Sequence, residues 1–239
     1  MSATDSQVKK LQHVVVIPDG DRRWAKAKGL PPWEGHRRGA DNVQNMLAAC
    51  KERNIPYLSM WGFSTENWDR NPEEVSQMMD MFRSFLKTKS KMILDNKIRV
   101  RHLGRKDRLP QDLLEGIHEL EQKTAHFTEW NYQVLLDYGG QDEIVRATKK
   151  VVAAVQAGEL SANEITTDSF YDYLDTAGIP NPDFIIRTSG EQRLSGILPY
   201  QAVYAELLFV PENFPDFTKE RMLQVLDEYE HRTRRFGAG

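Results

Sequence analysis

The stretch with the clearest chemical content runs from Val14 to Trp24 and reads VVVIPDGDRRW. An apolar run typical of a buried strand ends at Pro18, and two acids, a glycine and two arginines follow at once. Carboxylates repel phosphate and arginines bind it, so a site that carries both usually holds a metal ion between the acid and the phosphate. The stretch therefore indicates a Mg²⁺-assisted phosphate site, in which Gly20 lets the backbone approach the ligand and the start of a helix adds free N–H groups. Taken alone, it fits an aspartate that caps a basic, solvated helix equally well.

A second arginine-rich stretch, RTSGEQRLS, spans residues 187–195. It places Arg187 and Arg193 with two serines around a glycine, and these residue types bind phosphate oxygens. Standard nucleotide motifs do not compete, because the sequence has neither G-x-G-x-x-G after its first strand nor G-x-x-x-x-G-K-[ST]. No cysteine–histidine cluster indicates zinc. Two arginine clusters therefore predict two anionic groups, and hence two diphosphate substrates.

The elements that position these residues alternate between strands and helices. Short apolar runs predict six strands, at 13–18, 57–63, 98–104, 132–140, 183–190 and 206–211. Amphipathic stretches predict helices over 41–54, 72–96, 109–124, 142–158 and 218–237, with Gly158 typical of a helix end. The Pro-rich stretch 29–36 is interpreted as a loop. The alternation favours an α/β fold with a mostly parallel six-stranded sheet and helices on both faces.

The region 72–95 has two interpretations. Its periodicity alone favours an ordinary packed helix over the wall of an elongated cavity. The residues concerned are Met78, Met79, Met81, Phe82, Phe85 and Leu86.

Polar residues gather where the predicted strands end. Ligands of open α/β sheets bind beyond the carboxyl ends of the strands. The second strand is followed by Ser64-Thr65-Glu66-Asn67-Trp68 and Arg70, the fourth ends at Asp137-Tyr138-Gly139-Gly140, and Glu206 stands at the start of the sixth. Because loops are polar anyway, this pattern supports a phosphate site without establishing it.

The bulk composition bounds the class of protein. The chain has 239 residues, 40% of them hydrophobic, and a formal net charge of −3, so no global basic field points to nucleic acid. The single cysteine, Cys50, is expected to be a small buried hydrophobe, and a reducing cytosol is the simplest compartment. The first 13 residues show no signal peptide, and no window reaches the length of a membrane span.

Several motifs together resemble the cis-prenyltransferases, the undecaprenyl diphosphate synthase family of isoprenyl transferases. They occur in order over nearly the whole chain: DGDRRWAKAKG…GHRRG, FSTENWDRNPEEV, YGG, PDFIIRTSGEQRLSG, YAELLF…PDF and RRFG. The resemblance implies one catalytic domain over 13–239 after an N-terminal tail, 1–12, and an elongated hydrophobic tunnel. It implies Mg²⁺-dependent condensation of isopentenyl diphosphate with an allylic diphosphate, commonly farnesyl diphosphate, to give a Z-polyprenyl diphosphate such as undecaprenyl diphosphate. It also implies a homodimer in the cytoplasm that can contact the membrane peripherally to release its product.

The resemblance assigns roles to individual residues. Asp19 matches the essential acid and Mg²⁺ ligand, Asn67 a proton acceptor, and Glu206 a second Mg²⁺ ligand supplied across the dimer interface. The allylic diphosphate loop comprises Gly20, Asp21, Arg22, Arg23 and Trp24, with His36 nearby. A mobile second motif comprises Ser64, Thr65, Glu66, Asn67 and Trp68, and contacts to isopentenyl diphosphate come from Arg70, Arg187, Arg193, Leu194 and Ser195.

Four residues depart from the family pattern. The family usually has methionine at Pro18, asparagine at Asp21 and Asp137, and often arginine at Pro32. These departures are expected to cluster around the allylic diphosphate, and they leave a short-chain or irregular-coupling enzyme as an alternative. Gly62 weighs against a very short product, because the resemblance suggests that a bulky residue there shortens chains. A non-catalytic partner subunit is disfavoured, because such subunits lose the first-motif aspartate and the full RTSGE loop, which this chain retains.

Overall fold

The computed structural model describes residues 10–230. The RRFG motif, the end of the helix predicted to reach residue 237 and most of the predicted tail lie outside the described residues.

A single six-stranded sheet forms the centre of the molecule, and every pairing in it is parallel. Its order is β3-β4-β2-β1-β5-β6, so the chain crosses over between neighbouring strands as in other α/β folds. The strands are β1 (His13–Ile17), β2 (Tyr57–Ser64), β3 (Ile98–Leu103), β4 (Trp130–Tyr138), β5 (Phe184–Arg187) and β6 (Glu206–Phe209). The six predicted strands are confirmed, and each lies within a few residues of its predicted bounds.

Seven α-helices connect or flank the strands within the described part of the chain. They are α1 (Asp21–Ala27), α2 (Pro32–Glu52), α3 (Pro72–Asp95), α4 (Gln111–Thr124), α5 (Gly140–Gln156), α6 (Thr167–Tyr171) and α7 (Lys219–Glu230). A 3₁₀ segment, η1 (Thr65–Asp69), follows β2. None of the helices in residues 10–230 has the length and apolar content needed to cross a membrane.

The loop predicted over 29–36 is wrong in its second half, because α2 begins at Pro32. A proline is well placed at the first position of a helix, where its missing N–H would have no partner. Gly35 is buried against the backbone of Asp21, so a side chain there would collide with that backbone. The two prolines therefore mark a helix start and not a longer loop.

The two faces of the sheet are covered differently. The larger core packs α2, α3 and α7 onto alternating strand residues such as Val14, Val16 and Leu58. The opposite alternation, which includes Val15 and Ile17, packs against the irregular segment around 179–202. Cys50 lies in the larger core, and burial raises the pKa of its thiol to about 12, which confirms its expected structural role.

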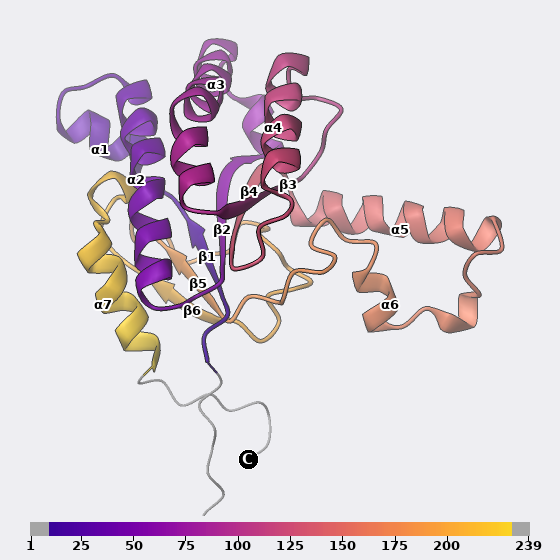
Figure 1. Cartoon of the computed structure of the whole chain (residues 1–239). Helices are drawn as coiled ribbons and strands as arrows, with labels where there is room; N and C mark the ends of the chain where they lie inside the picture. The colour runs from indigo at the N-terminus through magenta and orange to yellow at the C-terminus, as the bar shows by residue number, and fades with distance from the viewer. Residues whose placement is uncertain (1–9, 231–239) are drawn as a thin grey trace, which may run out of the picture.

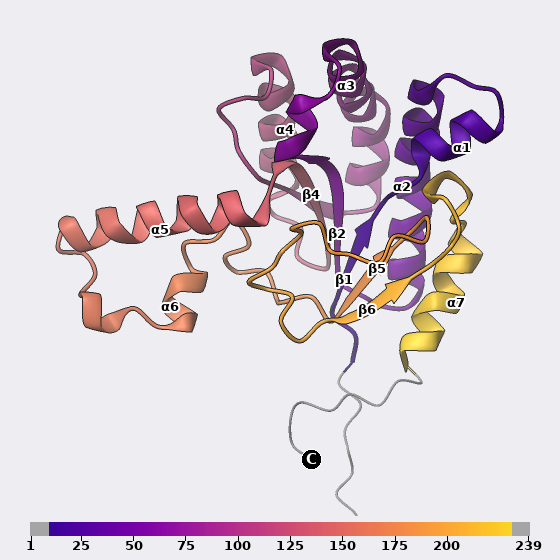
Figure 2. The same ribbon diagram turned by 180° about the vertical axis from the view of Figure 1, so that it is seen from behind.

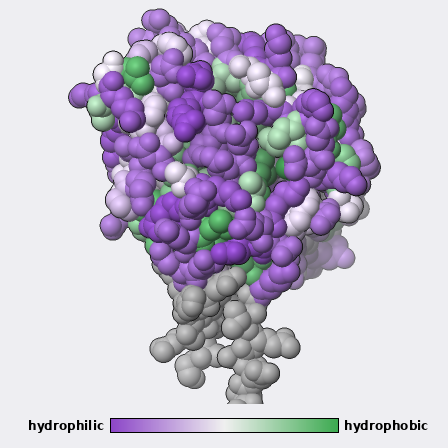
Figure 3. Space-filling model, turned by 60° about the vertical axis from the view of Figure 1, so that its left-hand side comes forward, coloured by the Kyte–Doolittle hydropathy of each residue, from purple (hydrophilic) through white to green (hydrophobic). Residues whose placement is uncertain are grey.

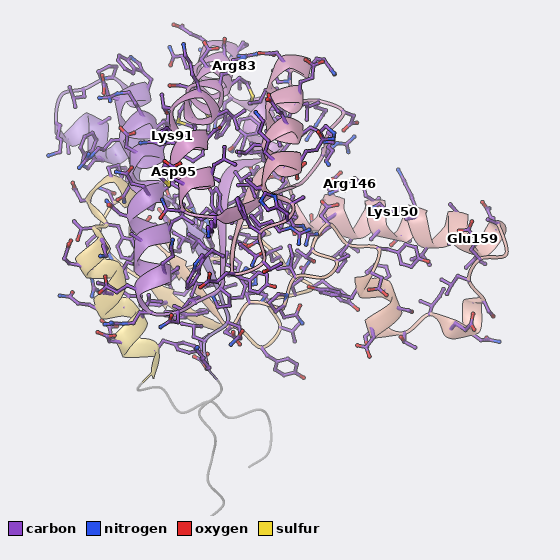
Figure 4. The ribbon with its side chains drawn as sticks, in the orientation of Figure 1. Arg83, Lys91, Asp95, Arg146, Lys150 and Glu159 are labelled. Carbon is purple, nitrogen blue, oxygen red and sulfur yellow. The ribbon has the colours of Figure 1, made fainter. Side chains whose placement is uncertain are left out.

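Figures 1 and 2 show α5 leaving the body of the protein, with α6 below its middle. Arg146, on the inner part of α5, forms a two-bond ion pair with Asp175, in the segment after α6, at 2.6 and 2.8 Å. Figure 4 shows Arg146 on the inner part of α5 and Glu159 just past its outer end. Figure 3, in which the side of α1, α2 and α7 comes forward, shows a mostly hydrophilic surface with small, separate hydrophobic patches.

Candidate active site

A cavity of about 410 Å³ lies beyond the carboxyl ends of β1, β2 and β5. Its position agrees with the rule for ligand sites in parallel sheets. Nine of the predicted site residues line it: Asp19, Asp21, His36, Ser64, Asn67, Arg70, Arg187, Arg193 and Ser195. The loops after three different strands therefore meet in one place, as the sequence predicts.

Asp19 joins the two arginine-rich loops. One carboxylate oxygen accepts a hydrogen bond from Arg187 at 2.9 Å, and the other accepts one from Arg23 at 3.2 Å. The backbone of Asp19 is fixed by the hydroxyl of Thr188, which lies 2.8 Å from both its N–H and its carbonyl oxygen. Burial alone would raise the pKa of Asp19, but the hydrogen bonds and charges of the two arginines outweigh burial and lower it. Asp19 is therefore a stable anion at the cavity wall.

Gly20 is required by its own backbone conformation and by its neighbours in the fold. Its φ of 99° lies in the left-handed region that favours glycine. A Cβ at this position would lie 2.2 Å from Oδ1 of Asn213 and 2.5 Å from Oγ of Ser189. The loops that carry Asn213 and Ser189 thus approach Gly20 closely.

The remaining residues of the first loop lie around the cavity without lining it. Arg23 also bonds Glu191 at 3.0 Å, and the indole N–H of Trp24 donates to Asp216 at 2.8 Å. Arg22 is 59% exposed and lies 3.8 Å from Glu74. Every one of these side chains therefore has a protein partner.

Asp21 points at His36. Oδ2 of Asp21 lies 3.1 Å from Nδ1 of His36, whereas Oδ1 is buried without a hydrogen-bond partner. Gly39 of α2 provides the room, since a Cβ there would lie 2.9 Å from Oδ1. The Asp21 carboxylate therefore lies at the cavity wall beside His36.

Hydrogen bonds within the second arginine loop, 187–195, hold its shape. Arg187 is almost fully buried and donates to Oγ of Ser195 at 2.8 Å and to the carbonyl oxygen of Arg193. Arg193 is exposed and pairs with Glu191. Leu194 is turned away from the cavity and packs against the second core.

A buried network supports the segment that carries Ser195. Glu143, on the first turn of α5, accepts hydrogen bonds from Tyr138 at 2.6 Å and Gln201 at 3.0 Å. The backbone N–H of Gly140 donates to the carbonyl of Gly196 at 2.9 Å. The end of β4 and the start of α5 thus fix the position of the second arginine loop.

The motif after β2 forms the third part of the wall. The backbone N–H of Ser64 donates to the amide oxygen of Asn67 at 3.1 Å, which completes a capping box around η1. Thr65 and Glu66 bond each other at 2.7 Å and do not line the cavity, and neither does Trp68. Asn67 is therefore held in a fixed orientation at the wall.

Apolar residues make the rest of the cavity. They come from β2 and β4 of the sheet and from α3: Met60, Phe63, Met78, Met81, Phe82, Phe85, Tyr132 and Val134. The packed-helix interpretation of 72–95 holds for Met79 and Leu86, which belong to or pack against the core clusters. Met78, Met81, Phe82 and Phe85 line the cavity, and Met78 is a core residue as well.

One predicted site residue, Glu206, and one departure from the family pattern, Asp137, lie elsewhere. Glu206 is the first residue of β6, opposite the first residue of β5, and strand starts lie at the other edge of the sheet from the cavity. Asp137 is fully buried and bonds Trp68 at 2.9 Å, so it does not cluster with the other departures around the first loop. Pro18 and Asp21 do line the cavity, whereas Pro32 begins α2.

Glu74 is a site residue that the sequence analysis missed. It accepts a hydrogen bond from Arg70 at 2.9 Å and lies 3.8 and 3.9 Å from Arg22 and His36. The signal was present, because Arg70 and Glu74 stand four residues apart across the start of a predicted helix. Glu74 thus links the first loop to the motif after β2.

The donor set fits a metal ion only when a ligand shares it. No group of three or more histidine, cysteine, aspartate or glutamate side chains that could hold an ion occurs among residues 10–230. Mg²⁺ is often held by one or two carboxylates together with substrate phosphates. Asp19, ionised and at the cavity wall, suits that second arrangement.

Comparisons with known proteins agree with this geometry. Residues 17–237 match a family model described as "Putative undecaprenyl diphosphate synthase". An isoprenyl transferase of Agrobacterium fabrum is 43% identical over 227 residues, covering 95% of this chain and 92% of that protein. A tritrans,polycis-undecaprenyl-diphosphate synthase (geranylgeranyl-diphosphate specific) of Thermococcus kodakarensis is 39% identical, covering 95% of this chain and 86% of that protein.

Among solved structures, lavandulyl diphosphate synthase from Lavandula x intermedia, in complex with dimethylallyl diphosphate, superposes with a TM-score of 0.92 at 33% identity. The match covers 95% of this chain and 98% of that one. Family model, relatives and fold agree over nearly the whole chain, so the resemblance of the motifs is confirmed. The chain therefore belongs to the cis-prenyltransferases, the undecaprenyl diphosphate synthase family of isoprenyl transferases.

Proposed function

We propose that this isoprenyl transferase condenses isopentenyl diphosphate units onto an allylic diphosphate, such as farnesyl diphosphate, and makes a Z-polyprenyl diphosphate. The observation that carries the proposal is the bond between Asp19 and Arg187, which brings two arginine-rich loops to one cavity. Two anion sites above an apolar floor suit two diphosphates with hydrocarbon tails.

In this proposal the two loops divide the substrates. Arg187, Arg193 and Ser195 bind the diphosphate of isopentenyl diphosphate, with Arg70 across the cavity. The loop from Asp19 to Arg23 holds the allylic diphosphate beside His36. The buried side chain of Arg187 supports this division, because its fixed position suits a group that must orient the attacking double bond.

The proposed reaction breaks the allylic C–O bond, and the diphosphate leaves with the bonding electrons. The double bond of isopentenyl diphosphate attacks the allylic carbon, and a proton is then lost to form the new Z double bond. Mg²⁺, when bound at Asp19 with the leaving diphosphate, would offset the negative charge that develops there. Arg23 and Arg187 keep Asp19 ionised for that role, and Asn67 faces the cavity as the proposed proton acceptor.

The apolar wall supports a product longer than the substrates. Gly62 lines the cavity beside Phe82 and Leu136, whose side chains already fill the space that a side chain at position 62 would need. We propose undecaprenyl diphosphate as the product and an apolar tunnel as its path. A shorter or irregularly coupled product is the second candidate, because the lavandulyl enzyme superposes so closely.

We also propose that two copies form a dimer through the side of α5 and β6. Val145 and Val152 are about half exposed and lie seven residues apart on α5. Val203, Tyr204 and Leu207 are exposed beside the edge strand β6. Such an interface is the proposed route by which Glu206 reaches a neighbouring site as a second Mg²⁺ ligand. Light scattering that shows an active monomer would contradict it.

The location of the protein follows from the product. We propose that it works in the cytoplasm and touches the membrane surface when it releases a long polyprenyl chain. Leu30, in the loop between α1 and α2, and Trp33, at the start of α2, are exposed and support such a contact.

The test of the proposed function uses the purified full chain with Mg²⁺, farnesyl diphosphate and labelled isopentenyl diphosphate. Product length is read by chromatography against polyprenol standards. Incorporation of several units supports chain elongation. A product formed from dimethylallyl diphosphate alone, with no isopentenyl incorporation, would favour the irregular-coupling enzyme and contradict the proposal.

A further inference from the structure

The segment that carries Asn67 has few attachments of its own. Within η1 the N–H of Arg70 donates to the carbonyl of Asn67 at 3.2 Å, and Ser64 bonds the Asn67 side chain. These bonds are local and fix the shape of the segment. Its position relative to the cavity must come from contacts with other elements.

Trp68 supplies one such contact, from the buried end of β4. Its indole N–H donates to Oδ1 of Asp137 at 2.9 Å, and its ring packs edge-on against Phe63. Arg108, from the loop after β3, donates to Oδ2 of Asp137 at 2.9 Å and also bonds Oδ1. The Arg108 guanidinium lies 5.8 Å from the centre of the Trp68 ring. Asp137 is thus a buried carboxylate that joins the indole to an arginine.

Thr65 supplies the other contact. It packs against Gly139, which lies two residues after Asp137 in the chain. A Cβ on Gly139 would lie 2.3 Å from Oγ1 of Thr65, so the threonine packs directly over this glycine. The φ of Gly139 is −141°, which any residue adopts, so the glycine is needed for space and not for conformation. The end of β4 therefore supports η1 at both of its ends.

We propose that Asp137 and Arg108 are positioning residues that hold η1, and with it Asn67, against the cavity. The inference rests on the proposed function for its catalytic consequence. A carboxylate serves this role in a way that an asparagine does not, because both of its oxygens accept hydrogen bonds from Arg108 while one also accepts from Trp68. The departure at position 137 therefore belongs with Arg108, and it acts through the motif after β2.

A double-substitution cycle tests the pair: Asp137→Asn, Arg108→Gln and the two together. Each single variant should lower kcat by about tenfold, because a displaced Asn67 no longer meets the reacting atoms. The KM for isopentenyl diphosphate, bound on the Arg187 side, should change by less than about twofold. Hydrogen exchange of the amides of residues 64–70 should speed up. The loss of transition-state stabilisation in the double variant, calculated from kcat, should be smaller than the sum of the losses in the two single variants.

Two further variants keep the test sharp if the singles fold poorly. Gly139→Ala leaves the ion pair intact but displaces Thr65, so it should reproduce the faster exchange and lower kcat. Arg105→Gln is the matched control, since Arg105 lies in the same loop as Arg108 but its side chain bonds Asp107 and Asp142, and its backbone bond to the Asp137 carbonyl is kept in the variant. It should leave both readouts unchanged.

Two results would overturn the inference: unchanged exchange at 64–70 in all these variants, or a lower melting temperature with unchanged kcat and exchange. The exchange measurement does not depend on turnover. If the wild-type chain shows no condensation while the exchange responds as expected, the proposed function fails and the positioning contact stands.

Discussion

Replacing the two arginines of the second loop should separate binding from stability. Arg193 is 60% exposed and pairs with Glu191 at the surface, whereas the side chain of Arg187 is 6% exposed and bonds Asp19 and Ser195. Both should contact isopentenyl diphosphate. Only Arg187, however, also holds the cavity together.

The magnitudes follow from burial. A charge-assisted hydrogen bond contributes about 1.5–3 kcal/mol, so Arg193→Ala should raise the KM for isopentenyl diphosphate by roughly 10- to 150-fold. Its loss should change the free energy of unfolding by less than about 1 kcal/mol, as for other exposed pairs. Arg187→Ala leaves Asp19 with a single arginine partner, and removing one member of a buried pair costs about 3–5 kcal/mol. That variant should therefore lose stability and kcat together.

Initial rates at saturating farnesyl diphosphate give the KM values, and chemical denaturation gives the free energies of unfolding. Arg83→Ala serves as the control, because Arg83 is a partly exposed arginine of α3 with its own partners, Asp80 and Asp112 (Figure 4). It should change neither quantity appreciably. A larger rise in the KM for farnesyl diphosphate than for isopentenyl diphosphate in Arg193→Ala would show that the two loops are assigned the wrong way round.

Three further outcomes are expected. Gly62→Leu should shorten the product, as read by chromatography. A Cβ there would already lie 2.8 Å from Leu136 and 3.3 Å from Phe82, so a larger side chain must enter the cavity. An unchanged chain length would contradict the place of Gly62 in the wall that limits the product. Asp21→Asn should lower the KM for farnesyl diphosphate by about fivefold. Removing one negative charge at about 4 Å from the diphosphate is worth on the order of 1 kcal/mol. Superimposable Mg²⁺ titrations of wild type and variant would show that Asp21 does not act on the ligand. The pKa of Asp19 is lowered, so its contribution to stability is present at neutral pH and is lost as pH falls through its folded pKa. The melting temperatures of wild type and Asp19→Asn should therefore converge toward acidic pH. A difference in melting temperature that persists there would contradict the ion pair with Arg187.

The strands and the location of the site were predictable from the sequence for a physical reason. In a parallel sheet that is buried on both faces, strands appear as short apolar runs, and all the strand ends lie at one edge. Polar residues that follow Ile17 and Arg187, and those at and after Ser64, therefore form the cavity wall that the sequence predicts.

The partners of individual side chains were not predictable in this way. The contact between Asp21 and His36 depends on where α2 begins, and prolines such as those at 31–32 are typical both of loops and of helix starts. The burial of Asp137 depends on the loop after β3, which no motif marks. Contacts between elements distant in the chain set these partners, and local sequence carries little information about such contacts.

The account depends most on Asp19, which joins both phosphate loops and lines the cavity. The most direct test measures labelled isopentenyl incorporation by Asp19→Ala beside wild type, with a melting curve of each protein. We expect the variant to fold and to lose incorporation almost completely, because it can neither share Mg²⁺ with the leaving diphosphate nor orient Arg187. Near-normal incorporation by a folded Asp19→Ala protein would contradict the central claim that this carboxylate organises a two-diphosphate site.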